Sequence, residues 1–351
     1  MRKTLAFVAG LTLGAFALSM SLTSCSDKPS MAGGTRSEIT FSVLSVENSE
    51  NLDKMWQPIF ADMEKQTGLK IKPFYSTSYT ALIEAMRFNQ VQAGFYSSAS
   101  GLEAMRRANA EVFAHNTNPD GSDGYSAIII TKAGSKVTLD DVLKCDHKLN
   151  FGIGDVKSTS GTIAPKAFLF LPRKIDTDNC FKNIKSGSHG TNIEGVLAGV
   201  LDAATANTDS LKELSDTPEG REKLAKLKVL WQSDPLPKGV MEYRSDLDPT
   251  TKEKLRSFFL SYGQGTGPEA ERQRANLAAF QWGPMKPSDA SYLLPERLME
   301  ATVALQEARL AGKADDAAKA QAELDAAKKE QAALAASSAP QAAPDAAPAS
   351  K

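Results

Sequence analysis

Ser158, Thr159 and Ser160 are three consecutive hydroxyl residues that precede Gly161 at the end of an apolar stretch. The segment that follows, residues 162–171, is compatible with a helix. Because the start of a helix offers unpaired backbone N–H groups and the positive end of a dipole, such a turn can bind a phosphoryl-like anion. One serine or threonine here would also be an ordinary helix cap. Three hydroxyls exceed that need, so we predict an anion site.

Alternating strand and helix patterns must position this turn. Strands are predicted at residues 38–44, 69–74, 91–96, 125–131, 149–153, 181–186 and 201–206. Helices are predicted at residues 52–67, 79–88, 101–110, 162–171 and 191–200, with a short helix capped by Thr138. This alternation is typical of an α/β fold, in which ligands bind at the carboxyl ends of strands and often between domains.

Polar residues stand at several of the predicted strand ends. They are Tyr96, Ser158, Thr159, Ser160, His189 and Asp209. Tyr79 begins a predicted helix, and Tyr125 follows a glycine-rich turn. If the sheets are parallel, the strand ends meet at one rim. Each residue also has a purely structural interpretation, because tyrosine is often half-buried in packing and His189 can be an exposed residue of a turn.

The first 25 residues predict export. Met1, Arg2 and Lys3 precede an apolar stretch that contains no charged residue up to Met20, and this stretch is short for a membrane span. Residues 22–25 resemble a bacterial lipobox, so Cys25 would be the lipidated first residue of a membrane-anchored periplasmic lipoprotein. Simple cleavage nearby is the alternative. Residues 26–37 predict a flexible tether.

Composition excludes some partners and leaves one cysteine pair open. The net charge of −1 and the lack of long basic runs argue against nucleic acid. Three scattered histidines lack metal-ligand spacing, and no metal or cofactor is expected. Cys145 and Cys180 each precede a predicted strand. If those strands are neighbours, a disulfide can form in an oxidising compartment; otherwise both are free thiols.

The C-terminal part changes in character near Arg297, where it becomes rich in Ala, Gln, Glu and Lys. Residues 297–335 predict one exposed helix with an apolar stripe that includes Leu298, Val303 and Leu305, and residues 336–351 predict a disordered tail. The stripe is consistent with packing on the helix's own domain or with a homodimer contact.

A resemblance covers the chain from about Ile39 to the late helix. The segments that carry it are residues 86–89, 124–125, 154–161 and 207–209, with Trp231 and residues 281–284. Together they resemble the phosphonate-binding proteins of ABC importers. The resemblance implies a two-domain periplasmic binding protein of type II that closes over its ligand at a hinge and passes it to a membrane permease and its ATPase. It also implies that the chain is no enzyme.

The domain boundaries follow from this resemblance together with the composition. They are a signal peptide at 1–25, a tether at 26–37, the first part of domain 1 at 38–133, domain 2 at 134–238, the return to domain 1 at 239–296, the C-terminal helix at 297–335 and the tail at 336–351.

The resemblance also implies roles for single residues. Ser158, Thr159 and Ser160 would hold the phosphonate oxygens, and Tyr79, Tyr125 and His189 would complete the cage. Asp209 occupies the place of an acid that contacts the amine of an aminoalkylphosphonate. A second acid is expected after the Trp231 strand, but Gly239 stands there, and Asp234 would need a shifted loop to replace it. We therefore expect phosphonate, phosphite, methylphosphonate or a phosphate ester, with the preference for the side chain open.

Two other functions use the same residues. The binding fold could serve as an anion sensor for a membrane kinase. Alternatively, Ser160, His189 and Asp209 could be the nucleophile, base and orienting acid of a hydrolase. No G-x-S-x-G sequence surrounds Ser160, and three adjacent hydroxyls suit an anion site better than one activated nucleophile.

Overall fold

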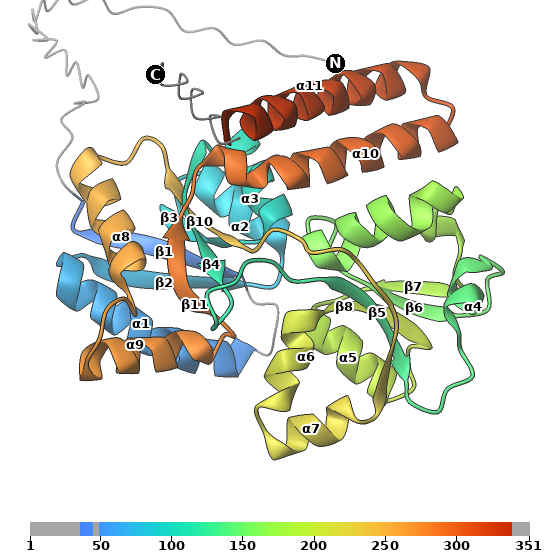
Figure 1. Cartoon of the computed structure of the whole chain (residues 1–351), viewed down its shortest axis with the longest axis horizontal. Coiled ribbons are helices and arrows are strands. Elements are labelled where there is room, and N and C mark those ends of the chain that lie inside the picture. The colour runs from blue at the N-terminus through green and yellow to red at the C-terminus, as the bar shows by residue number, and fades with distance from the viewer. Residues whose placement is uncertain (1–35, 45–48, 339–351) are drawn as a thin grey trace, which may run out of the picture. The chain divides into compact units, whose positions relative to one another are not determined.

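The computed structural model describes residues 36–44 and 49–338 (Figure 1). The predicted signal peptide, Cys25 and most of the predicted tether and tail lie outside the described residues. Within the described residues, no helix combines the length and the apolar character needed to cross a bilayer.

The first of two mixed β-sheets has six strands in the order β11-β4-β10-β3-β1-β2. Their bounds are β1 (Glu38–Leu44), β2 (Lys70–Ser76), β3 (Ala93–Tyr96), β4 (Ala110–Thr117), β10 (Val240–Arg244) and β11 (Gly283–Pro287). The first three strands are parallel, and β10 runs antiparallel to β3 and β4. Because residues alternate between the faces of a strand, Ile39, Phe41 and Val43 of β1 enter one core together.

Helices cover both faces of the first sheet (Figure 1). An aromatic core that contains Trp56, Phe60 and Phe259 lies between one face and α1 (Ser49–Thr67), α8 (Pro249–Ser261) and α9 (Pro268–Ala278). The other face packs against α2 (Tyr79–Arg87) and α3 (Ser98–Arg107).

The second sheet has five strands in the order β7-β6-β8-β5-β9. Their bounds are β5 (Ala127–Lys132), β6 (Asn150–Ile153), β7 (Asn183–Ser186), β8 (Ala203–Asn207) and β9 (Leu227–Gln232). β6, β7 and β8 are parallel, whereas β5 is antiparallel to β8 and β9. The expectation of one parallel rim is therefore only partly right. Ala127 pairs with Asn207, so the beginning of β5 meets the end of β8.

Helices also cover the second sheet. α5 (His189–Leu197) and α6 (Thr208–Ser215) pack on one face, and α7 (Pro218–Leu224) packs on α6. The other face carries α4 (Leu139–Leu143) and a continuous helical segment, residues 159–173, that lies along an apolar core. This segment consists of η1 (Thr159–Ile163), η2 (Lys166–Phe170) and η3 (Leu171–Arg173), and η4 (Thr177–Asn179) follows it.

Two antiparallel segments connect the sheets. Residues 118–126 run from β4 to β5, and residues 233–239 return from β9 to β10. Tyr125 and Leu236 bridge them through two backbone hydrogen bonds of 3.3 and 2.7 Å. The domain boundaries predicted from the sequence stay a prediction.

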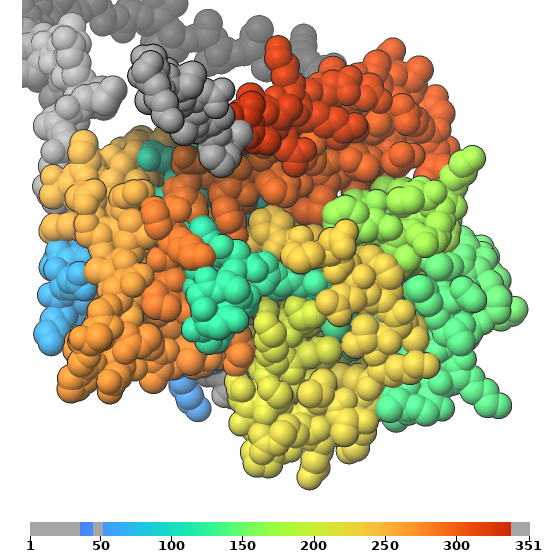
Figure 2. All heavy atoms as spheres, in the orientation of Figure 1, coloured from blue at the N-terminus to red at the C-terminus, as the bar shows by residue number. Residues whose placement is uncertain are grey.

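The C-terminal region forms a helical hairpin and not the single helix that was predicted. η5 (Ala290–Leu293) leads into α10 (Leu294–Leu310), and α11 (Ala314–Ser338) folds back on α10. Gly312 has a φ of +68° and ends α10, since glycine adopts this left-handed conformation without steric cost. Figure 2 shows the orange and red C-terminal helices against the light-green segment that contains η2, where Lys166 pairs with Glu307.

The predicted elements up to residue 206 are present, with shifted ends. The sequence interpretation did not predict the strand β4. The buried residues of β4 include the polar residues His115, Asn116 and Thr117, so polar and apolar residues do not alternate along it. It also assigned no elements to residues 240–293, which form β10, α8, α9 and β11.

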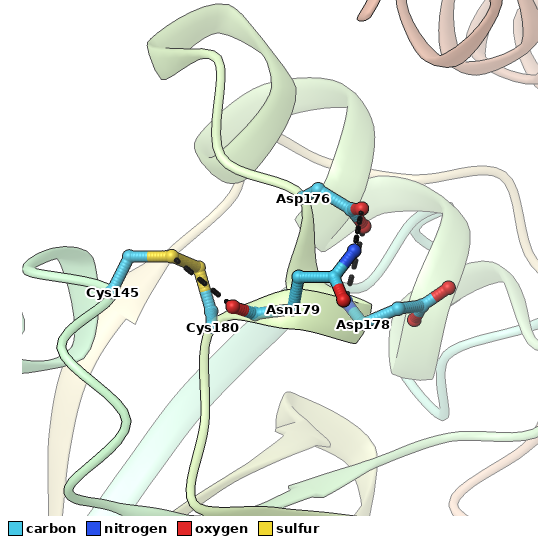
Figure 3. Close-up of a disulfide and its surroundings, with 5 residues drawn as sticks. All are labelled: Cys145, Asp176, Asp178, Asn179 and Cys180. Atoms are coloured by element: carbon cyan, nitrogen blue, oxygen red, sulfur yellow. Dashed lines mark hydrogen bonds between the residues drawn. A yellow bond between two sulfur atoms is a disulfide. The ribbon is translucent and has the colours of Figure 1, made fainter. Parts of the chain in front are cut away.

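A disulfide joins Cys145 to Cys180 beside the second sheet (Figure 3). The strands that follow these cysteines, β6 and β7, are hydrogen-bonded neighbours. The condition that the sequence set for this bond is therefore met.

Candidate functional site

Ser158 begins the helical segment that follows β6. Its Oγ accepts a hydrogen bond of 3.1 Å from the Gly161 N–H and so caps the helix. Ser158, Thr159 and Ser160 are all buried. The first backbone N–H groups of a helix have no partner within it, so this buried start offers donors to a ligand.

Two glycines allow the helix start to sit against the end of β6. A Cβ on Gly154 would lie 2.7 Å from the Gly161 Cα, and a Cβ on Gly161 would lie 2.8 Å from the Gly154 Cα. The Gly154 N–H donates to the Gly161 carbonyl at 3.0 Å. Any side chain at either position would push the helix start away from the strand.

A cavity of about 240 Å³ opens at this helix start. Its lining residues are Thr77, Ser78, Tyr79, Asp155, Ser158, Ser186, Gly187, Ser188 and His189. A larger hollow of about 500 Å³, lined by residues such as Gln66, Thr250 and Lys254, opens widely to solvent elsewhere and contacts none of the predicted site residues.

Three of the lining residues are the capping serines of separate helices. Ser78 caps α2, Ser158 caps η1, and Ser188 caps α5; each side-chain oxygen accepts a hydrogen bond from its own helix. The positive ends of three helices therefore converge on one cavity, and they come from both sheets. This arrangement favours an anion.

Tyr79 and His189 complete the wall. The Tyr79 hydroxyl donates to Ser158 Oγ at 3.4 Å. His189 Nε2 lies 3.1 Å from Ser160 Oγ, while its buried Nδ1 has no protein partner among the described residues. Burial lowers the pKa of His189 to about 4, so the ring is neutral near pH 7 and one ring nitrogen is available to a ligand.

Ser160 also connects the cavity to Tyr125. The Tyr125 hydroxyl lies near the Ser160 side chain, and burial raises the pKa of this tyrosine. Thr159 has a different role from its neighbours, because its Oγ1 accepts a 2.9 Å hydrogen bond from the Ala99 N–H at the start of α3. Thr159 thus joins the helical segment to the first sheet's helices and does not line the cavity.

Asp209 lies near Tyr125 and is bonded to a residue that the sequence interpretation missed. Lys238 Nζ lies 2.6 Å from Asp209 Oδ2 and 5.5 Å from the centre of the Tyr125 ring. The Lys238 side chain is only 2% exposed. The only signal in the sequence is a lysine between Pro237 and Gly239, next to an apolar strand.

Gly239 has no space for the acid that was expected there. A Cβ at this position would lie 2.4 Å from Phe95 Cζ and 2.8 Å from the Tyr96 carbonyl oxygen. Asp234 is exposed, so it does not replace the missing acid. Tyr96 is fully buried and accepts a hydrogen bond from Ser42 in the core, so it is not a site residue.

The Ser160–His189–Asp209 triad is not assembled. Asp209 pairs with Lys238, and no carboxylate of the described residues is bonded to His189 Nδ1, so none of them orients the imidazole. In the part of the chain that the structure describes, no group of three or more His, Cys, Asp or Glu side chains could hold a metal ion.

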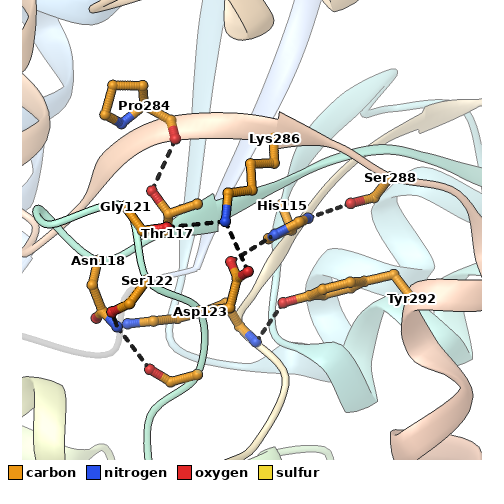
Figure 4. Close-up of polar contacts among 12 residues, drawn as sticks. His115, Thr117, Asn118, Gly121, Ser122, Asp123, Pro284, Lys286, Ser288 and Tyr292 are labelled. Atoms are coloured by element: carbon orange, nitrogen blue, oxygen red, sulfur yellow. Dashed lines mark hydrogen bonds and ion pairs between the residues drawn. The ribbon is translucent and has the colours of Figure 1, made fainter.

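A cluster of polar contacts holds the connecting segment of residues 118–126 against the first sheet, near Lys238 (Figure 4). His115 Nε2 contacts Asp123 at 3.0 Å, Lys286 Nζ contacts the same carboxylate at 2.9 Å, and the His115 ring stacks on Tyr292. The Tyr292 hydroxyl accepts a 2.9 Å hydrogen bond from the Lys238 N–H. The backbone that carries Lys238 is therefore held from the side of the first sheet.

Known proteins are similar to this chain in sequence and in fold. The sequence model of the family described as "ABC transporter, phosphonate, periplasmic substrate-binding protein" matches residues 41–293. The phosphonates-binding periplasmic protein of Escherichia coli K12 is 36% identical over 270 residues, which cover 77% of this chain and 78% of that protein. The phosphate-import protein PhnD of Mycolicibacterium smegmatis is 25% identical over 295 residues, or 80% of this chain and 86% of that protein.

A solved structure extends the likeness to the fold. The binding protein component of an ABC phosphonate transporter from Pseudomonas aeruginosa superposes with a TM-score of 0.79 at 32% identity. The match covers 86% of this chain and 99% of that chain. The predicted type II fold is confirmed.

Proposed function

Because the chain belongs to the family of periplasmic substrate-binding proteins of phosphonate ABC transporters, we propose that it binds a small phosphonate or related phosphorus oxyanion in the cavity between α2, η1 and α5. It delivers this ligand to an ABC permease that is driven by an ATPase. The convergence of three serine-capped helix starts on one cavity carries the proposal.

The ligand oxygens bind to hydroxyl and backbone N–H donors in this cavity. Ser158, Tyr79 and His189 line it, and Ser160 supports His189 from behind. Hydrogen bonds to a charged group contribute about 1.5–3 kcal/mol each, so a few of them suffice for tight binding. Thr159 positions these groups through its bond to α3, and Tyr125 lies near Ser160.

A thermal-shift panel tests the proposal. Phosphate, phosphite, methylphosphonate and 2-aminoethylphosphonate are added to the purified protein, and at least one should raise the melting temperature, because a ligand bound only by the folded state stabilises it. The Ser158→Ala, Thr159→Ala, Ser160→Ala triple variant should lose binding of every phosphorus ligand in calorimetry.

Thr138→Ala is the matched control. Thr138 caps α4 through a capping box remote from the cavity, so its loss weakens a helix cap without changing the site. This control should bind as the wild type does. A triple variant that binds with wild-type affinity would contradict the anion site.

We propose that the ligand is carried unchanged. Asp209 is engaged by Lys238 and cannot orient His189, so Ser160 has no activated base. Hydrolysis of a phosphate or carboxylate ester by the purified protein, abolished by Ser160→Ala, would show the opposite.

The placement at the membrane is also a proposal. Lipidation of Cys25 would hold the folded part near the permease by the tether of residues 26–37, and a Cys25→Ser variant should leave the membrane fraction.

A homodimer through the C-terminal helices is a separate proposal. The apolar residues Met299, Val303 and Leu305 of α10 are buried within the chain, so a dimer contact would use the faces of α10 that stay exposed. Leu310 is 43% exposed and is available to such a contact.

A further inference from the structure

Lys238 is a buried cation at the edge of the proposed ligand site. It lies on residues 233–239, which cross between the sheets, and its ammonium pairs with Asp209 at 2.6 Å over the ring of Tyr125. Asp209 itself lies in the first turn of α6, which follows β8 at the edge where β5 starts. Lysine is rarely buried unless it is paired, so this contact is part of the folded structure.

A series of contacts links this ion pair to the anion cavity. His189 lines the cavity and bonds Ser160, Ser160 lies near the Tyr125 hydroxyl, and the Lys238 ammonium lies 5.5 Å from the centre of the Tyr125 ring. The helix starts occupy one end of this series, and the Asp209–Lys238 pair occupies the other. Tyr125, Asp209 and Lys238 do not line the cavity itself, so a substituent on a bound phosphorus oxyanion would meet the ion pair by extending past Ser160 toward Tyr125.

We propose that Lys238 is a built-in ammonium group that occupies Asp209 and thereby selects phosphorus oxyanions without an amine. The proposal rests on the proposed function. A carboxylate at a ligand site is the natural counter-ion for a cationic substituent, but here Lys238 already neutralises it. A second ammonium beside Lys238 would be placed next to a like charge, which is unfavourable at a desolvated contact.

The surrounding charges strengthen this selection. Lys212 Nζ lies 3.7 Å from Asp209 Oδ1, so a second lysine is also close to the carboxylate. Gly239 leaves no space for another acid, because a Cβ there would overlap Phe95. The Glu213 carboxylate also acts on the Lys238 ammonium, but more weakly than Asp209 and Lys212 do.

Ligands of equal size separate charge from shape in the test. The purified wild-type protein is titrated by calorimetry with methylphosphonate, 2-hydroxyethylphosphonate and 2-aminoethylphosphonate. The hydroxyethyl ligand should bind at least about tenfold more tightly than the aminoethyl ligand, a difference of about 1.4 kcal/mol. Equal or tighter binding of the aminoethyl ligand would overturn the role of Lys238. The role of Lys238 would also be overturned if both ethyl ligands bind weakly and equally while methylphosphonate binds tightly. In that case the size of the ligand, and not its charge, would determine the affinity.

The Lys238→Met variant should cancel or reverse this preference. The substitution removes the ammonium and keeps most of the length of the side chain. Asp209 can then pair with the ammonium of the aminoethyl ligand, so the affinity for this ligand should rise about tenfold or more. The double variant Lys238→Met, Asp209→Asn should show no such gain. Lys212→Met is the matched control. Lys212 is 48% exposed and lies 3.7 Å from the same carboxylate, so its loss should change the preference much less than Lys238→Met does.

Failure of this inference differs from failure of the proposed function. A folded Lys238→Met variant that keeps the wild-type preference would overturn the inference alone. So would a folded variant that no longer binds any phosphonate, because that result would mean that Lys238 binds the anion itself. If Lys238→Met does not fold, the wild-type ligand ratio still decides. A wild-type protein that binds no phosphorus oxyanion would overturn the proposed function.

Discussion

A serine at a helix start meets two requirements in this protein. The oxygen of Ser78, Ser158 or Ser188 accepts a hydrogen bond from its own helix, at 3.2, 3.1 and 3.1 Å respectively. The hydroxyl proton remains able to donate to an anion. Capping and ligand binding, which were alternatives for Ser158 in the sequence, are therefore compatible at one residue.

His189 provides a prediction at the residue scale. Its pKa falls from 6.5 to about 4 through burial, so the unfolded chain takes up a proton before the folded one does. The contribution of His189 to stability is complete above pH 6.5 and decreases as the pH falls toward 4, by roughly 1.4 kcal/mol per pH unit. Urea unfolding of the wild type and of His189→Asn should show a smaller loss for the variant in this window.

The same comparison at pH 7 and 8 is the control, because neither state of His189 is protonated there to a large extent. The difference between the two proteins should then be constant. A variant that loses stability with the same slope as the wild type between pH 6.5 and 4 would mean that His189 is not buried in its neutral form.

At the scale of elements, α10 connects parts of the chain that belong to both sheets. Met299 and Val303 pack with Ala99 of α3 and with Ile163 and Ala167 of the helical segment. Arg106 pairs with Glu300, and Lys166 pairs with Glu307. The helix therefore stabilises the contact between α3 and the start of the segment that carries Ser158.

Glu296, in the first turn of α10, provides the prediction at this scale. Burial, and then the nearby Glu300, raise the pKa of Glu296 to about 8. A carboxyl whose folded pKa is raised loses its contribution as the pH rises from its unfolded value near 4.5 to 8. The unfolding free energy of Glu296→Gln relative to the wild type should therefore increase across this range, by roughly 1.4 kcal/mol per pH unit.

Glu307→Gln is the control on the same helix. Glu307 is 46% exposed and pairs with Lys166, so its substitution should shift stability only slightly and without this pH dependence. Equal slopes for Glu296→Gln and Glu307→Gln would contradict a protonated Glu296 in the folded protein.

At the scale of the whole molecule, the C-terminal hairpin is separate from the ligand cavity. Leu305 and Ala301 of α10 pack against Leu324 and Ala320 of α11, whereas the cavity residues lie on α2, η1 and α5. A chain that ends at Gly312 should therefore melt at a lower temperature yet bind the same phosphorus ligand with similar affinity. Differential scanning fluorimetry and calorimetry measure the two effects.

A longer truncation decides the homodimer, because a chain that ends at Gly312 keeps α10 and its exposed Leu310. If the C-terminal helices mediate the dimer, light scattering should find a dimer for the full chain and a monomer for the chain that ends at Leu293. An unchanged oligomeric state would remove this hypothesis. A chain that ends at Leu293 also lacks α10, and it should lose more stability because Met299 and Val303 no longer cover Ile163.

Local patterns in the sequence predict much of the fold and of the anion site. The strand at residues 38–44 matches β1, the Thr138 cap is formed, and the hydroxyl turn at Ser158 begins a helix. These features depend on side-chain alternation and on hydrogen bonds between residues three apart, so neighbouring residues suffice to specify them.

Contacts between distant residues decided the rest. The Lys238–Asp209 pair, the role of Thr159 at α3 and the return of α11 over α10 join positions whose separation in sequence carries no local signal. The sequence by itself predicted that an oxyanion site begins at Ser158. Only the tertiary structure decided that two other capped helices share that site and that a buried lysine occupies the acid beside it, because burial and charge pairing depend on which surfaces the folded chain brings together.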